Sequence, residues 1–316
     1  MRALHWDGSQ LRLRGTHPEP QLRENWACIR VHLAGICSTD LQILKGYMGF
    51  TGVPGHEFVG EVVAGGSTLL GKRVVGEINF ACGACEWCQQ QLGRHCPNRQ
   101  VMGILDADGS FAEYLSVPLA NLHEVPENVP DEAAVFTEPL AAAFEILEQI
   151  HPKPDAEVVV LGDGKLGLLC GQVLHMAGAR VTVIGKHEKK LATLRQLGIR
   201  AVVRTDWRPQ LVEIVIEVTG TTDGLDQALS IVRPRGTLVL KSTVAQAHML
   251  SLAPLVINEV TLVGSRCGPF PPALQALARE QLSVTPLIDT IYPLTDGLAA
   301  VHHAAQPGVG KVLLRP

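Results

Sequence analysis

The chain of 316 residues is long enough for about two domains of ordinary size. Hydrophobic residues make up 46% and charged residues 18%, which is typical of a globular protein, and the formal net charge of −4 gives no electrostatic reason to expect nucleic acid or an anionic membrane as a partner. No apolar run is long and clean enough to predict a membrane span.

Eight cysteines, without the apolar segment of a signal peptide after Met1-Arg2, indicate a reducing compartment, which we expect to be the cytoplasm. In such a compartment, clustered cysteines are metal ligands more often than disulfide partners. Three of the eight, Cys28, Cys170 and Cys267, lack the spacing of metal ligands, and we expect them to pack in the interior.

The first part of the chain, residues 1–140, is predicted to be rich in β-structure. Short alternating runs that end at glycine predict strands at 27–33, 58–64 and 72–76. The connections between them are rich in glycine and proline, which fits tight turns.

Cys37, His56 and Glu138 are the candidate catalytic metal ligands of this region. Cys37 lies in the motif G-I-C-S-T-D, His56 in G-H-E and Glu138 in T-E-P-L. A thiolate, an imidazole and a carboxylate are good zinc ligands, and three protein ligands with an open fourth position are typical of a catalytic zinc. The alternative for a single Cys or His is packing in the interior.

The most specific local pattern is C-x2-C-x2-C-x7-C, formed by Cys82, Cys85, Cys88 and Cys96. Four thiolates at this spacing can surround one tetrahedral zinc and leave no position for water, so the pattern predicts a structural zinc. The lobe that carries them, residues 79–98, has little apolar material of its own. An iron–sulfur cluster, which also uses four cysteines, and plain packing are the alternatives.

After Pro139 the pattern changes to alternating helices and strands. Strands are predicted at 157–161, 180–184, 201–203, 213–218 and 236–240. Helices are predicted at 140–147, from the glycine-rich segment 162–167 to about residue 177, at 189–197 and at 225–232. Such alternation implies right-handed crossovers and a doubly wound parallel sheet, so the predicted fold class is α/β.

The first of these strands runs into G-D-G-K-L-G (162–167), a G-x-G-x-x-G pattern that opens a helix. In this context the pattern predicts dinucleotide binding, and the alternative is a simple glycine turn. Gly162 permits the tight turn, Gly164 lets the backbone approach a pyrophosphate, and Gly167 lets the helix pack on the strand. The helix N-terminus then supplies amide groups to the phosphates.

The second strand of this region ends in Gly185-Lys186-His187 and not in an acid. An acid at this place binds the 2′-hydroxyl of the NAD ribose and repels a 2′-phosphate. A small residue followed by two potential cations favours NADP over NAD, and the nearest acid along the chain is Glu188. The alternative is that Lys186 and His187 form a solvated turn.

Residues 268–316 no longer follow the alternating pattern. A helix is predicted at 273–280 and a closing strand at 310–314, whose partner we expect in the N-terminal region. Arg266, just before this part, is a candidate contact to the cofactor or to a polar substrate, and the alternative is an exposed surface residue. The full set predicted to bind the cofactor is Gly162, Gly164, Lys165, Leu166, Gly167, Gly185, Lys186, His187, Thr219 and Arg266.

Together these motifs resemble the zinc-dependent medium-chain dehydrogenase/reductase family over essentially the whole chain. The Cys37 motif, G-H-E, the four-cysteine lobe, E-P-L (138–140) and the glycine motif occur in the family's order and at about its spacing. The E-P-L motif resembles the sorbitol, threonine and glucose dehydrogenase branch. The resemblance implies a GroES-like catalytic domain, residues 1–140 and 268–316, split around a Rossmann domain, residues 141–267, and assembly as dimers or tetramers.

The resemblance also implies a role for each candidate catalytic residue. Cys37, His56 and Glu138 would ligate the catalytic zinc, and Glu57 would lie beside the metal or reach it directly or through water. Thr39 would take the alcohol proton. The implied reaction oxidises a secondary alcohol or a polyol to the ketone with NADP or NAD, and the implied partner is a small molecule, with no nucleic acid or membrane.

Two departures from the family pattern leave rival functions open. Many relatives have a His five residues after the ligand Cys, and this chain has Gln42 at that position. Glutamine cannot titrate, so a proton relay must end in water, in the ribose hydroxyls or at another base. The chain is also somewhat shorter than typical relatives. The rivals are a zinc-independent quinone or enoyl reductase of the same superfamily and a non-catalytic nucleotide-binding protein that holds only the structural zinc.

Overall fold

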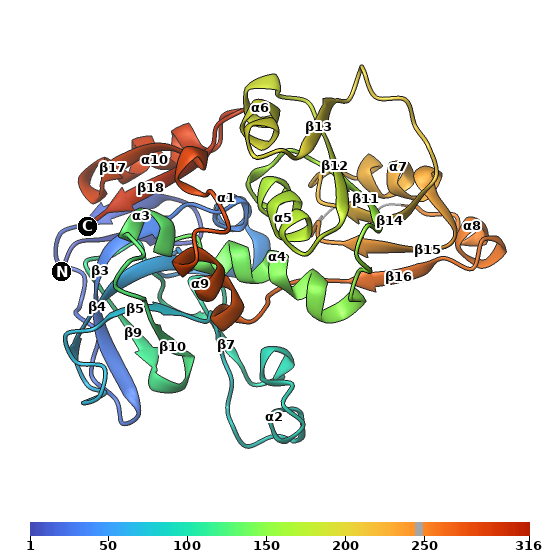
Figure 1. Ribbon diagram of the computed structural model, residues 1–316. Helices are drawn as coiled ribbons and strands as arrows, with labels where there is room; N and C mark the ends of the chain where they lie inside the picture. Colours follow the sequence, from blue (N-terminus) through green and yellow to red (C-terminus); the bar gives the residue numbers. More distant parts are fainter. Residues whose placement is uncertain (244–248) are drawn as a thin grey trace. The chain divides into compact units, whose positions relative to one another are not determined.

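The computed structural model describes residues 1–243 and 249–316, which form two compact units. Unit 1 contains Met1–Glu138, Leu274–Arg279 and Ile288–Pro316, and unit 2 contains Pro139–Ala273 and Glu280–Leu287 (Figure 1). The division that the sequence predicts falls at 140/141 and 267/268. The structure instead divides the chain after Glu138, and its C-terminal part contributes to both units.

Unit 1 is built on a seven-stranded sheet. Its strands are β3 (Trp26–Gly35), β4 (Glu57–Ala64), β5 (Arg73–Gly76), β9 (Tyr114–Pro118), β10 (Leu122–Glu124), β17 (Ile288–Pro293) and β18 (Lys311–Arg315). The order of hydrogen-bonded neighbours is β10-β5-β4-β3-β18-β17, and β9 also pairs with β3. The long strand β3 contacts β4, β9 and β18 and therefore organises the sheet, and the predicted strands of this region are confirmed with ends shifted by a few residues.

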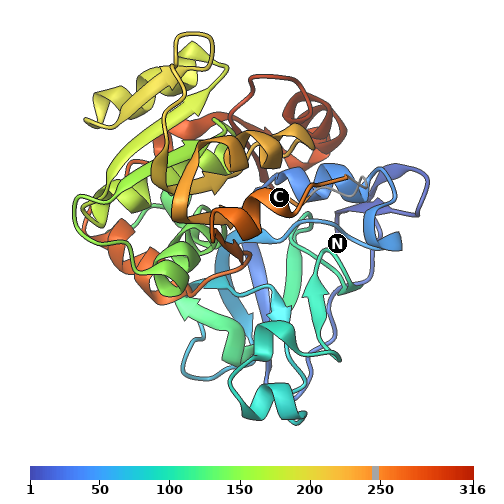
Figure 2. The same cartoon turned by 90° about the vertical axis from the view of Figure 1, so that its right-hand side faces the viewer.

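The remaining elements of unit 1 are short. They are β1 (Ala3–Trp6), β2 (Leu11–Arg14), β6 (Asn79–Phe80), β7 (Gln100–Met102), β8 (Asp106–Ala107), α1 (Ser38–Ile43), α2 (Glu86–Gln89), α3 (Asp131–Ala134), α10 (Gly297–Ala304) and the 3₁₀-helices η1 (Tyr47–Gly49), η2 (Gly93–His95), η3 (Leu119–Asn121) and η5 (Leu294–Asp296). The cyan segment around α2 projects from the rest of the unit in two views at right angles (Figures 1 and 2). This segment is the predicted four-cysteine lobe.

The closing strand β18 pairs with the N-terminal region, as the sequence predicts. It lies antiparallel to β3, with Leu313 opposite Gly35, and Ile36 donates its N–H to the carbonyl of Val312 at 3.0 Å. On its other side β18 pairs in parallel with β17. This register brings Lys311, at the start of β18, to the end of β3 where Cys37 follows.

Unit 2 contains a six-stranded parallel sheet, which confirms the predicted doubly wound α/β fold. Its strands are β11 (Glu157–Leu161), β12 (Arg180–Gly185), β13 (Arg200–Val203), β14 (Val212–Glu217), β15 (Val232–Leu240) and β16 (Thr261–Gly264). The order β13-β12-β11-β14-β15-β16 has the 3-2-1-4-5-6 pattern of dinucleotide-binding sheets. In this pattern the strand order reverses beside β11, between β11 and β14, so a ligand is expected at the carboxyl end of β11.

Helices cover the sheet of unit 2. They are α5 (Lys165–Met176), α6 (Glu188–Gln196), α7 (Asp223–Ile231), α8 (Ala253–Ile257) and the 3₁₀-helix η4 (Thr285–Leu287), while α4 (Thr137–Ile150) and α9 (Phe270–Ala278) carry residues of both units. The α7 residues Ala228 and Ile231 pack with Val159 and Leu161 of β11 in a buried cluster. Among helices in the described parts of the chain, none is long and apolar enough to cross a membrane.

Candidate active site

Cys37 is the N-cap residue of α1, directly after β3. Its backbone N–H donates to Oδ2 of Asp40 at 2.7 Å, which closes the first turn of the helix. The residue before it, Ile36, is held to β18 by strand pairing. Because the chain is held on both sides, the position of the Cys37 thiol is determined by the fold.

His56 immediately precedes β4 and is 3% exposed. Its Nδ1 lies 3.1 Å from Oδ1 of Asp40, a carboxylate that is 1% exposed. Burial alone would lower the pKa of His56, but the Asp40 carboxylate and the Cys37 sulfur raise it well above its ordinary value. An imidazole held at Nδ1 by a carboxylate presents Nε2 to a metal, as metal-ligating histidines usually do.

Thr39 lies on the first turn of α1, with its hydroxyl oxygen 3.9 Å from the Cys37 sulfur. The hydroxyl is therefore beside the group that would hold the metal. Gln42, which replaces the titratable residue of many relatives, is exposed on the same helix.

Glu57 begins β4 and is fully buried, and both its oxygens accept hydrogen bonds from the Lys311 ammonium, one of them at 2.7 Å. Lys311 is 2% exposed. Burial alone would lower the pKa of Lys311, but Glu57, Cys37 and Glu138 together raise it. Gly35 makes room for the pair, because a Cβ there would stand 2.1 Å from Oε2 of Glu57.

The donor atoms of Cys37, His56 and Glu57 all lie within 4.8 Å of one another, which is the spacing of ligands around one metal ion. Among the described residues, Glu138 is not part of this set, although its charge reaches Lys311. It is the second residue of α4 and is partly buried. A thiolate, an imidazole and buried acids suit zinc, and the assignment of Glu138 as the third ligand stays a prediction.

Two buried charged residues of this site, Asp40 and Lys311, had no role in the sequence analysis. Asp40 had a local signal, because it follows Cys37 by three residues and an acid at that spacing caps a helix. The sequence contains no local signal for the role of Lys311, because 254 positions separate it from Glu57. Only the pairing of β18 with β3 shows that the two meet.

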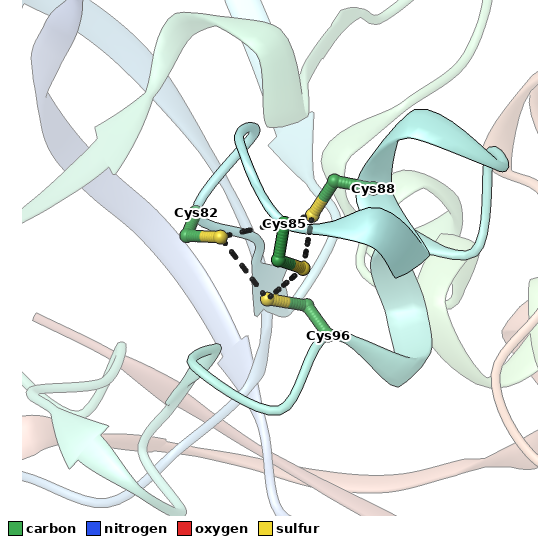
Figure 3. A group of neighbouring side chains, drawn as sticks. All are labelled: Cys82, Cys85, Cys88 and Cys96. Atoms are coloured by element: carbon green, nitrogen blue, oxygen red, sulfur yellow. Dashed lines mark hydrogen bonds between the residues drawn. The ribbon is translucent and has the colours of Figure 1, made fainter.

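The four cysteines of the lobe point toward one another (Figure 3). The sulfur–sulfur distances are 3.5 Å for Cys85–Cys88 and Cys82–Cys96, 3.7 Å for Cys85–Cys96 and 3.9 Å for Cys82–Cys88. A tetrahedral zinc with bonds of about 2.3 Å has sulfur–sulfur edges of about 3.8 Å, so the arrangement fits one zinc ion. The backbone N–H groups of Ala84 and Cys85 and the thiol of Cys96 lower the pKa of Cys82 to about 6, whereas burial and the other three thiols raise the pKa of Cys88 to about 12.

The glycine motif of unit 2 has the conformation that the sequence predicts. Gly162 has φ of 123°, a backbone conformation that favours glycine, and a Cβ there would stand 2.6 Å from the carbonyl oxygen of Val218. A Cβ on Gly167 would stand 2.1 Å from the carbonyl oxygen of Gly162. A Cβ on Gly164, the N-cap of α5, would meet no atom within 4 Å, so the backbone is open to an approaching group at that residue. Lys165 and Leu166 follow in the first turn of α5.

Asp163, which the sequence analysis left without a role, reaches the end of β12. Its Oδ2 accepts the backbone N–H groups of Lys186 at 2.8 Å and His187 at 2.6 Å, and lies 3.0 Å from Nδ1 of His187. Gly185 accommodates this carboxylate, because a Cβ there would stand 2.4 Å from the Asp163 Cβ. The glycine motif and the Gly185-Lys186-His187 turn are thus joined by one buried acid.

Thr219 also lies at the carboxyl ends of the strands. Its N–H and hydroxyl both donate to Oε1 of Glu217, a buried residue at the end of β14, at 2.8 and 2.6 Å. The Thr219 Cα would lie 3.1 Å from a Cβ on Gly162, so this residue supports the glycine turn. Arg266 is exposed, and its backbone carbonyl accepts a hydrogen bond from Lys241 at 2.9 Å. Its contact with a cofactor stays a prediction.

Of the three cysteines outside the metal sets, Cys170 is wholly buried in α5, as predicted. Burial raises the pKa of its thiol to about 11. Cys28 and Cys267 are partly buried. None of these three belongs to a group of metal-ligand donors in the described parts of the chain.

A parallel sheet with a glycine-rich phosphate turn, together with a β-rich unit that gathers metal-ligating side chains, defines the class of zinc-dependent dehydrogenases. Comparison with known families supports this class. Residues 23–127 match the alcohol dehydrogenase GroES-like domain, and residues 166–280 match the zinc-binding dehydrogenase family.

Individual relatives cover nearly the whole chain. The sorbitol dehydrogenase of Halalkalibacterium halodurans is 28% identical, covering 95% of this chain and 94% of the relative. The L-threonine 3-dehydrogenase of Streptomyces avermitilis is 30% identical, covering 94% of each. Among solved structures, a zinc-binding dehydrogenase from Sinorhizobium meliloti 1021 bound to NADP has a TM-score of 0.91 and 26% identity, covering 100% of this chain and 99% of the other. The chain therefore belongs to the zinc-dependent medium-chain dehydrogenase/reductase family.

Proposed function

We propose that this protein is a zinc-dependent dehydrogenase that oxidises a secondary alcohol or a polyol to the ketone with a nicotinamide cofactor, and catalyses the reverse reaction. The observation that carries the proposal is the set of Cys37, His56 and the buried acid Glu57, whose donor atoms lie within metal-ligand distance of one another. Sorbitol dehydrogenase among the relatives supports a polyol as the substrate class.

In this proposal Cys37, His56 and Glu138 hold a zinc ion and leave one position open. When bound, the zinc ion would supply a Lewis acid for the substrate hydroxyl, and the nicotinamide would supply the hydride acceptor for the carbon that carries this hydroxyl. Thr39 accepts the hydroxyl proton and passes it toward solvent. Asp40 holds the His56 ring in the orientation that ligates, through the contact between Nδ1 and the carboxylate.

The two rival functions are less well supported. A zinc-independent reductase has no need for a buried Cys–His–acid set or for the Asp40 contact that orients His56. A nucleotide-binding protein with only the structural zinc has no need for Thr39 beside the Cys37 sulfur. Both rivals predict one zinc ion per chain, whereas the proposed dehydrogenase holds two.

Zinc per chain, measured by elemental analysis, tests the proposal. We expect about two zinc ions in the wild type, one of which is lost in Cys37→Ser and the other in Cys82→Ser, because the two sites are separate. Cys37→Ser should also abolish turnover of a panel of polyols while NADPH binding, followed by fluorescence, is kept. A single zinc that depends on Cys82 alone, or turnover retained in Cys37→Ser, would contradict the proposed function.

We further propose that the cofactor is NADP in preference to NAD. Both acids near the Gly185-Lys186-His187 turn are engaged: Asp163 Oδ2 by three donors and Glu188 by an ion pair with Arg195. Lys186 is exposed at the end of β12, where an NAD-specific acid would stand. A 2′-phosphate at this turn would meet a cation and not an unpaired carboxylate.

Lys186→Ala tests the cofactor preference. We expect it to weaken NADPH binding by roughly tenfold, because one charge-assisted contact to the 2′-phosphate is lost, and to leave NADH binding unchanged. Dissociation constants from nicotinamide fluorescence measure both. Lys189→Ala, an exposed lysine one turn away on α6, is the matched control, and equal losses for NADPH and NADH would contradict the preference.

Three further properties belong to the same proposal. The four-cysteine lobe holds a structural zinc that replaces the apolar core the lobe lacks, which the tetrahedral spacing of the sulfurs supports (Figure 3). The protein acts in the cytoplasm, as its cysteine content suggests.

The protein assembles at least as a homodimer. Strand β16 ends the sheet of unit 2, and its outer edge has no partner among the described strands.

A further inference from the structure

Lys241 is a buried cation of unit 2, and the proposed reaction has no step for it. It is the first residue after β15 and is 8% exposed. Its ammonium donates to the carbonyl of Ala142 at 2.6 Å, to the hydroxyl of Ser265 at 3.0 Å and to the carbonyl of Arg266 at 2.9 Å. These three acceptors are neutral oxygens, so the hydrogen bonds stabilise the buried ammonium without cancelling its charge.

The ammonium belongs to the edge of the unit 2 sheet where a dinucleotide is expected. Strands β15 and β16 are parallel neighbours, and Lys241 and Ser265 are the first residues after them. Gly162 follows β11 at the same edge. In sheets of this order a dinucleotide spans the crevice, with the adenosine ribose at the end of the second strand, here β12. The nicotinamide half is therefore expected at the ends of β14, β15 and β16.

Another buried charge near this edge, that of Glu217, lies on the other face of the sheet. Glu217 is opposite Leu240 in the register of β14 and β15, so their side chains share one face and that of Lys241, the next residue, points to the opposite face. The Glu217 carboxylate accepts hydrogen bonds from Thr219 and lies against the start of α7. The ammonium instead contacts α4. Burial raises the pKa of Cys170 in α5, and the charge of Lys241 opposes that effect.

A fixed positive charge distinguishes the two redox forms of a nicotinamide cofactor. The oxidised nicotinamide ring carries a positive charge, and the reduced ring is neutral. In the proposed oxidation a hydride, with its two electrons, passes from the alcohol carbon to the ring, and the hydroxyl proton passes to solvent. The ring loses its positive charge in this step. A buried ammonium near the ring therefore destabilises the oxidised form and favours the transfer.

We propose that the buried ammonium of Lys241 makes the protein bind the reduced cofactor more tightly than the oxidised cofactor, and so makes the bound oxidised cofactor a stronger hydride acceptor. The inference rests on the proposed function, because it presumes a nicotinamide cofactor at the glycine motif. The charge is held in place from two sides, because Gln149 of α4 also donates to the carbonyl of Gly264, at the end of β16, at 3.0 Å.

The ratio of two dissociation constants tests the inference without turnover. NADP⁺ and NADPH differ only in the nicotinamide ring, so contacts to the phosphates and the adenosine cancel when one constant is divided by the other. Isothermal titration calorimetry measures both constants. In Lys241→Met, which keeps the length of the side chain but not its charge, we expect NADP⁺ to bind about tenfold more tightly and NADPH binding to change by less than about threefold. NAD⁺ and NADH give the same test if the protein prefers them.

Three further variants separate the charge from the packing. Ser265→Ala removes one hydrogen bond but keeps the ammonium, so it should keep the wild-type ratio. Lys153→Met removes an exposed lysine that precedes β11, at the amino ends of the strands, and should also keep the ratio. Lys241→Gln keeps a hydrogen-bond donor without the charge, so it should change the ratio as Lys241→Met does, and it replaces that variant if Lys241→Met does not fold.

An unchanged ratio in Lys241→Met and Lys241→Gln would overturn the inference. Equal weakening of both cofactor forms would overturn it as well, because Lys241 would then only hold the structure of this edge. Failure of the proposed function looks different, because the wild type itself would then bind neither form of the cofactor or would hold a single zinc ion.

Discussion

Buried charge is the main feature of the candidate site at the scale of single residues. Asp40, His56, Glu57 and Lys311 are each no more than 3% exposed. A buried charge without a partner is strongly destabilising, but these four form two pairs, Asp40 with His56 and Glu57 with Lys311. The first pair fixes the ring of the predicted ligand His56, and the second fixes the carboxylate of Glu57 beside it.

Asp40→Asn tests the first pair. The amide keeps the size of the carboxylate but loses the charge that holds the Nδ1 proton of His56, so we expect metal affinity at the Cys37 site to fall about 10- to 100-fold. Competition with a chromophoric chelator measures the affinity. Asp106→Asn, an exposed acid of the same unit, is the control. Equal affinities in wild type and Asp40→Asn would mean that the contact does not support the ligand.

The turn Gly185-Lys186-His187 is also organised around a buried acid, Asp163. Asp163 fills the space beside Gly185 and accepts three donors from the turn, so the conformation of Lys186 and His187 depends on a residue from the preceding loop. The nearest acid along the sequence, Glu188, is instead paired with Arg195 on α6. The charges at this turn are therefore set by three-dimensional pairing and not by sequence order.

At the scale of elements, an ionic network joins β3, β5 and α3 just before Glu138. Arg73 donates to Oδ1 of Asp131 and to the carbonyl of Val129, both at 2.8 Å, and His32 lies 2.9 Å from Oδ2 of Asp131. These contacts fix the start of α3. Because α3 leads directly into the segment that carries Glu138, the network contributes to the position of the predicted third ligand.

This network predicts a pH-dependent contribution to stability. Hydrogen bonds and charges from His32 and Arg73 lower the pKa of Asp131. In the unfolded chain the pKa of Asp131 is about 3.9, and in the folded protein it is lower. Between these two pKa values the unfolded chain binds more protons than the folded protein. The contribution to stability is therefore complete above the unfolded pKa and is lost as the pH falls through the folded pKa.

We therefore expect Asp131→Asn to reduce the free energy of unfolding at pH 7 by on the order of 1 kcal/mol, since the site is partly exposed. The difference from the wild type should shrink as the pH falls below the unfolded pKa. Urea unfolding at several pH values measures it, with the exposed acid variant Asp155→Asn as the control. A difference that persists at the lowest pH would show that the loss is not electrostatic.

At the scale of the whole molecule, the edge of the unit 2 sheet is a surface suited to a second copy of the chain. Leu252, Val256 and Ile257 in and beside α8, and Leu262 in β16, are exposed apolar side chains near this edge. An edge strand presents unpaired backbone donors and acceptors, and two copies of one edge can pair antiparallel about a twofold axis. Such pairing would continue the sheet from one subunit into the other.

Leu262→Lys tests this assembly. A charge in the apolar edge should oppose pairing, so the mass measured by light scattering should fall from at least twice 34.0 kDa to 34.0 kDa. Leu211→Lys, which alters an exposed leucine elsewhere in unit 2, should leave the wild-type mass unchanged. A wild type that is already monomeric, or a Leu262→Lys variant that keeps the wild-type mass, would exclude the β16 edge as the interface.

The amino-acid sequence by itself determined the features that depend on neighbours along the chain. Strand and helix positions followed from hydrophobic periodicity, and the roles of Gly162 and Gly167 followed from their spacing after a strand. The four-cysteine lobe followed in the same way, since its cysteines lie within fifteen residues of sequence. Periodicity and turn chemistry act over a few residues, which is why such features can be predicted without a structure.

Only the tertiary structure decided which distant charges meet. Lys311 reaches Glu57 because β18 pairs with β3 in one register, and Asp163 reaches His187 because two loops share the carboxyl edge of a parallel sheet. The physical reason is that burial makes an unpaired charge costly, so the fold must bring a partner, but the chain segment that supplies it depends on strand order and register, which local patterns do not specify.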